Sequence, residues 1–148
     1  MLALIGGAVA IGSAWLPWMT VGGSGWSGVD AVTSNMGLAN GNYLVGVGIL
    51  AAVCGLLVAL GAARGSGKML LGLGVLVGAI GILGVEVAAY LKMSDFVSEY
   101  NSFGSLYGIN ASVGWGIFVG AGGGLMAGVG GLLTLASRPS AAPAPITR

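Results

Sequence analysis

Few side chains in this sequence could do chemistry. The chain has no histidine and one cysteine among its 148 residues, with five lysines and arginines and four aspartates and glutamates. Nucleophilic catalysis and metal binding draw on histidines, clustered cysteines or paired acids, and the sequence holds no HExxH, GxSxG or P-loop pattern. We therefore expect a protein that is not an enzyme and that binds no cofactor or metal.

Glu86 is the one ionisable residue inside a long apolar run. Acids at membrane depth are uncommon and often functional. Glu86 precedes Lys92 by six residues, which is about 9 Å along a helix, so we expect it near the outer edge of a membrane. Two interpretations stay open. Either a partner such as the Tyr90 hydroxyl or a loop donor satisfies the carboxyl, or the carboxyl handles ions or protons.

The composition indicates an integral membrane protein. Hydrophobic residues make up 56% of the chain and charged residues 6%, whereas soluble domains carry about 25% charged residues. A net charge of +1 leaves no basic patch that could bind nucleic acid. We expect the lipid bilayer of the plasma membrane to surround the chain.

Four apolar runs are long enough to cross a bilayer, which takes about 20 helical residues. They predict an all-α, four-helix membrane bundle over residues 1–136. A Pro/Ala/Ser-rich segment, 137–148, predicts a disordered tail. The predicted spans are residues 2–20, 43–63, 69–91 and 113–136.

The basic residues predict the orientation of the chain. Four of them lie between the second and third runs or in the tail: Arg64, Lys68, Arg138 and Arg148. The other two connections carry Lys92 against three acids, namely Asp30, Asp95 and Glu99. The positive-inside rule then places both termini in the cytoplasm. As an alternative, the first run could be a cleaved signal peptide, which would leave three spans and a cytoplasmic tail.

The fourth run carries a glycine stripe. Small residues four apart let two membrane helices approach closely. The stripe either packs the helices of one chain together or forms a seam between subunits of an oligomer. Its members are Gly116, Gly120, Gly124 and Gly128.

Aromatic residues mark the segment between the third and fourth runs. They fall at helical spacing and predict a short amphipathic helix outside the cytoplasm. Its aromatic face would lie on the outer leaflet, cover the bundle as a lid, or bind a partner. These residues are Phe96, Tyr100, Phe103 and Tyr107.

The first outer connection is rich in glycine and serine and contains Trp26 and Asp30. Together with Trp15 and Trp18, Trp26 is typical of an aromatic belt at the headgroup level. Trp26 and Asp30 could instead contribute to a recognition surface, because loops of this kind often carry function.

The layout resembles a group of known proteins. The first run closes in SAWLPWMTV, and the loop after it reaches SGVD. With three further Gly/Ala/Val runs and a Pro/Ala tail, the chain resembles small four-span membrane proteins of actinobacteria and their phages. The resemblance implies location and architecture but no functional residue. Some prophage proteins of this plan block infection by other phages, which offers an analogy for function.

Two functional hypotheses follow. The first is a non-enzymatic membrane protein that acts through protein–protein contacts, as an accessory subunit of a membrane complex or as a phage-type exclusion factor. The second is a homo-oligomeric channel or transporter with Glu86 near its pathway.

Overall fold

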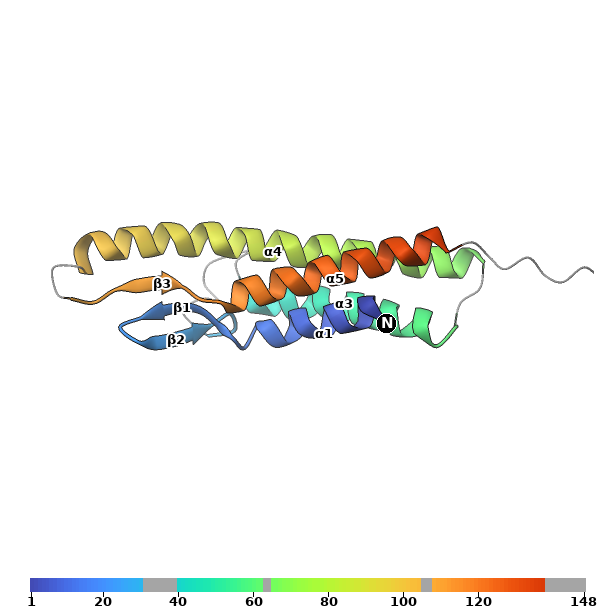
Figure 1. The fold of residues 1–148 in the computed structure, drawn as a ribbon, viewed down its shortest axis with the longest axis horizontal. Helices are drawn as coiled ribbons and strands as arrows, with labels where there is room; N and C mark the ends of the chain where they lie inside the picture. Colours follow the sequence, from blue (N-terminus) through green and yellow to red (C-terminus); the bar gives the residue numbers. More distant parts are fainter. Residues whose placement is uncertain (31–39, 63–64, 105–107, 138–148) are drawn as a thin grey trace, which may run out of the picture.

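The computed structural model describes residues 1–30, 40–62, 65–104 and 108–137. In these residues four helices run side by side as an elongated bundle, and a small antiparallel sheet lies at one end of it (Figure 1). The elements in chain order are α1 (Leu2–Ser13), β1 (Pro17–Val21), β2 (Ser24–Ser27), α3 (Gly41–Ala59), α4 (Ser66–Gly104), β3 (Ala111–Val113) and α5 (Gly116–Ala136).

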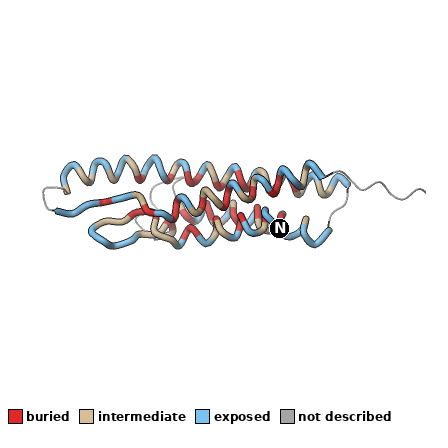
Figure 2. The backbone as a smooth tube through the Cα atoms, viewed as in Figure 1, coloured by how far each residue is buried: buried red, intermediate tan, exposed pale blue. Residues whose placement is uncertain are grey.

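The helices form a ring in which α1 packs on α3 and α5, and α4 packs on the same two helices from the opposite side. Small residues set these contacts. A Cβ on Gly6 of α1 would collide with the backbone of Ala127 in α5, and a Cβ on Gly7 would meet the backbone of Ala52 in α3. The buried residues accordingly gather along the inner faces of the helices (Figure 2).

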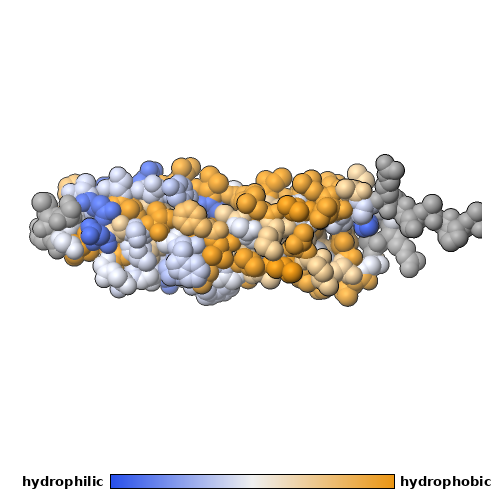
Figure 3. Space-filling view, in the orientation of Figure 1, coloured by the Kyte–Doolittle hydropathy of each residue, from blue (hydrophilic) through white to orange (hydrophobic). Residues whose placement is uncertain are grey.

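Apolar side chains also cover the outside of the bundle. Leu70 and Ile80 are both 69% exposed, and Leu125 is 61% exposed. Figure 3 shows this apolar surface over the helices and a more hydrophilic surface over the sheet end. Within the described part of the chain, three helices, α3, α4 and α5, are long and apolar enough to cross a membrane. The prediction of apolar helices with the length of membrane spans is thus confirmed for these three.

The first predicted span, residues 2–20, is shorter than expected. Helix α1 ends at Ser13 after 12 residues, about 18 Å, and Pro17 already begins β1. Proline lacks an N–H and disfavours helical backbone at the residue before it. The following Trp-Met-Thr-Val residues suit a strand.

The sheet corrects the all-α prediction. Strand β1 lies in the centre, with β2 and β3 antiparallel on either side. The β1–β2 hairpin turns at Gly22 and Gly23, whose φ angles of 55° and 88° favour glycine over other residues. The composition of this segment predicted only a loop, but its glycines form the turn of a hairpin.

The prediction of a separate amphipathic helix after the third span is also wrong. Helix α4 continues without a break through 39 residues to Gly104, a length of about 58 Å, whereas a hydrocarbon core is about 30 Å thick. No proline or glycine interrupts residues 85–103. The helix extends past the bundle and runs along the sheet (Figure 1). Packing supports this extension, because Met93 is fully buried and Val97 packs on the core.

Candidate functional site

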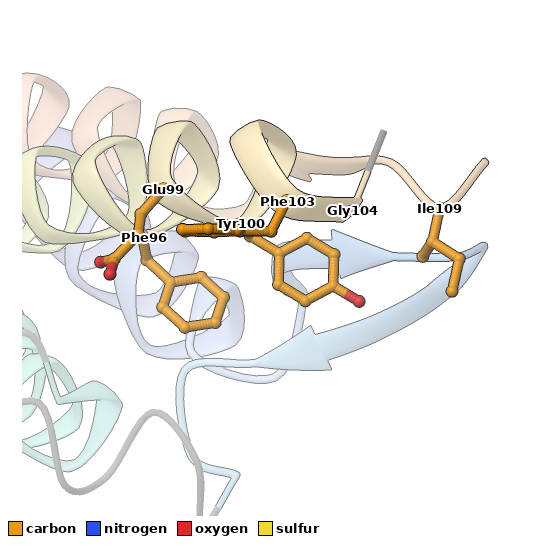
Figure 4. Close-up of a pocket in the computed structure, with 6 residues that line it drawn as sticks. All are labelled: Phe96, Glu99, Tyr100, Phe103, Gly104 and Ile109. Atoms are coloured by element: carbon orange, nitrogen blue, oxygen red, sulfur yellow. The ribbon is translucent and has the colours of Figure 1, made fainter. Parts of the chain in front are cut away.

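The last turns of α4 carry an open groove of about 400 Å³, here called the aromatic groove. Figure 4 shows its side chains: rings from α4 and Ile109 from the segment that leads into β3. Three of the four aromatic residues that helical spacing placed on one face, Phe96, Tyr100 and Phe103, do meet here. The lining residues are Phe96, Glu99, Tyr100, Phe103, Gly104 and Ile109.

The groove is held in shape by local contacts. The rings of Phe96 and Tyr100 stack with their centroids 6.0 Å apart. The Ile109 N–H donates to the Gly104 carbonyl over 3.2 Å. A Cβ at Gly104 would lie 2.8 Å from the Ile109 carbonyl oxygen and 3.0 Å from the Tyr100 ring, so this return of the chain requires glycine.

Asn101 fastens the end of α4 to the sheet. Its side-chain amide donates to the Ala111 carbonyl over 2.9 Å, and its side-chain oxygen accepts from the Ala111 N–H over 2.8 Å. The amide thereby pairs with β3 much as a neighbouring strand would. This contact fixes the aromatic face of α4 relative to β3.

The aromatic groove combines apolar and acidic character. Glu99 lies in the lining, and Asp95, one turn earlier on α4, is exposed. Phe103 is 68% exposed. Exposed rings beside a carboxylate suit an apolar ligand segment that carries a positive charge.

The remaining predicted contact residues lie elsewhere. Trp26 belongs to β2, opposite Met19 of β1, and its side chain packs on the core. Asp30 accepts a hydrogen bond from the Ser27 N–H just after β2. Neither lines the aromatic groove, and Tyr107 lies outside the described residues.

Trp18 does not belong to an aromatic belt. Its side chain is fully buried, and its indole N–H donates to the Ser13 carbonyl over 3.0 Å. Trp15 is 58% exposed, as a belt residue would be. Trp18 lies on β1, and its side chain reaches back to the last residue of α1.

Glu86 lies inside the bundle, 1% exposed. The Ser13 hydroxyl of α1 is 3.4 Å from its Oε1 and 2.7 Å from the Ala10 carbonyl. Because a hydroxyl has one hydrogen to donate, Glu86 Oε1 competes for it with the Ala10 carbonyl, which lies closer. Its Oε2 has no hydrogen-bond partner among the described residues.

The partner of Glu86 differs from the one expected. The Tyr90 ring is 42% exposed and packs edge-on against Phe118, with centroids 6.0 Å apart. Ser13, which the sequence analysis did not single out, supplies the contact instead. The available signal was a serine inside the first apolar run.

The glycine stripe of α5 faces other parts of the same chain. A Cβ on Gly124 would meet Ile82 and Leu83 of α4, and one on Gly128 would approach Ala79 of α4. Gly120 faces the Glu86 carboxyl, and Gly116 faces Pro17 and Trp18. These contacts favour packing within one chain. A seam between subunits would need another face of α5.

No family model, curated protein or solved structure matches this chain. The candidate site therefore rests on its own geometry.

Proposed function

We propose that this protein is a non-enzymatic membrane protein that acts by binding another protein through the aromatic groove. It would serve as an accessory subunit of a membrane complex or as an exclusion factor of the phage type. The observation that carries the proposal is the groove itself: exposed aromatic residues on a helix that extends past the apolar part of the bundle.

The groove has the chemistry of a protein contact. Aromatic side chains are favoured where binding energy concentrates, and α4 and β3 hold them in place through Asn101. With Glu99 in the lining, the partner we propose presents an apolar segment with a lysine or arginine beside it.

Matched phenylalanine variants test this proposal. Phe103, 68% exposed in the groove, and Phe118, 59% exposed on the outside of the bundle, are each replaced by alanine. We expect Phe103→Ala to lower the mass of the assembly isolated in mild detergent from native membranes, and Phe118→Ala to leave it unchanged. An unaltered assembly in the Phe103→Ala variant would refute the groove as the contact.

We further propose that the chain crosses the plasma membrane four times, with both termini in the cytoplasm. The short α1 would then span the hydrocarbon together with the residues that lead into β1. To test this, Cys54 is replaced by alanine and a single cysteine is placed at Ser24 or at Ser66. In intact cells, a membrane-impermeant maleimide should label the cysteine at position 24 but not the one at position 66. Labelling at position 66 only would show the opposite topology.

The buried carboxyl favours a second candidate function, an ion channel or transporter. Glu86 has an oxygen without a partner among the described residues, and it borders an outer groove of about 200 Å³ between α4 and α5. Proteoliposomes should then conduct ions, and Glu86→Gln should change the flux. An absence of ion flux in proteoliposomes of the unaltered protein would exclude this function.

A further inference from the structure

We propose that the end of the bundle opposite the sheet binds the headgroup of an acidic phospholipid, with Lys68 as the phosphate ligand. The proposal rests on the membrane placement given above and is independent of the protein partner. It concerns two grooves, of about 310 and 290 Å³, that share Lys68, Thr134 and Ser137 in their linings.

Among the residues that the structure describes, no acid lies in contact with the Lys68 ammonium. The described residues offer its ammonium no ion pair or hydrogen bond, and its backbone N–H donates to Gly65. The next acid along α4 is Glu86, 18 residues further and thus about 27 Å away. Electrostatic screening acts over about 8–10 Å in physiological salt, so the charge is available to an anion.

The grooves fit an amphiphile better than a free anion. One runs between the ends of α1, α3 and α5, with Leu2 and Leu133 in its lining; the other adds Met69 beside Lys68. These apolar side chains are exposed. They can contact acyl chains while the ammonium group contacts the phosphate.

Hydroxyl groups in the grooves indicate the headgroup class. Thr134 donates to the Gly130 carbonyl over 2.8 Å, and Ser137 donates to the Thr134 carbonyl over 2.7 Å. Their hydrogens are thus engaged, and their oxygens can still accept. A headgroup that joins a phosphate to donor hydroxyls, as phosphatidylglycerol does, complements both Lys68 and these acceptors.

Native mass spectrometry of the detergent-purified chain tests the site by titration with phosphatidylglycerol or phosphatidylcholine. We expect phosphatidylglycerol to bind about fivefold more tightly, the effect of one cation near an anionic surface. Lys68→Gln should abolish this preference and Lys68→Arg should keep it. The matched control is Lys92→Gln, near the opposite end of the bundle, which should also keep it.

Three results would overturn the proposal. The first is equal binding of the two lipids by the unaltered chain, and the second is an equal loss of preference in Lys68→Gln and Lys92→Gln. The third is displacement of bound phosphatidylglycerol by inorganic phosphate alone, because the site would then be one for free phosphate. Failure of the chain to insert into vesicles would instead refute the membrane placement.

Discussion

Replacing Gly120 by alanine tests the packing around the buried carboxyl. A Cβ at this position would overlap Glu86 Oε1 and lie 2.6 Å from the Ser13 hydroxyl oxygen. Gly122, half a turn along the same helix, has no described residue within 4 Å of its Cβ position. Both substitutions gain the same helix propensity, up to about 1 kcal/mol. Their difference therefore isolates the packing cost, for which overfilled cores give about 1–3 kcal/mol.

The assay is reversible unfolding in mixed detergent micelles, followed by tryptophan fluorescence. We expect Gly120→Ala to lower the free energy of unfolding by about 1–3 kcal/mol relative to Gly122→Ala. In a Glu86→Ala background this difference should fall by at least half, because the overlapping oxygen is gone. Equal stabilities of Gly120→Ala and Gly122→Ala, within about 0.5 kcal/mol, would refute the reasoning.

Two further predictions concern the sheet end. Asn101→Ala removes both hydrogen bonds to Ala111. In hydrogen exchange it should lower the protection of the Ala111 amide by about 1–3 kcal/mol. The control Ser102→Ala, which loses one exposed hydrogen bond, should leave this protection unchanged. Trp18→Phe removes the indole donor to the Ser13 carbonyl. It should lower the free energy of unfolding by about 0.5–1.5 kcal/mol. A variant as stable as the unaltered chain would show that this hydrogen bond contributes nothing.

Helix periodicity and hydropathy were sufficient to predict the three long apolar helices, because lipid requires long apolar stretches. They also predicted the shared face of Phe96, Tyr100 and Phe103. Periodicity did not show that this face continues α4, since that depends on Met93 and Val97 packing against the bundle and the sheet.

The sheet depends on contacts between residues far apart in the chain. Met19 of β1 pairs with Val113 of β3, and nothing local in either segment encodes that pairing. Local signals for the hairpin did exist in the adjacent glycines of its turn, which sequence analysis interpreted only as loop. The contact between Ser13 and Glu86 is likewise tertiary, because the two residues lie 73 positions apart.

Site-specific photo-crosslinking tests the central claim, that the aromatic groove meets a partner protein. A benzoylphenylalanine replaces Phe103 in the groove or, as the control, Phe118 on the outside of the bundle, and cells are irradiated with the protein in its native membrane. We expect one protein to be crosslinked at position 103 but not at 118, through an apolar peptide that contains a lysine or arginine. Glu99→Gln should reduce the yield. Crosslinks to lipid only, or the same products at both positions, would contradict the claim.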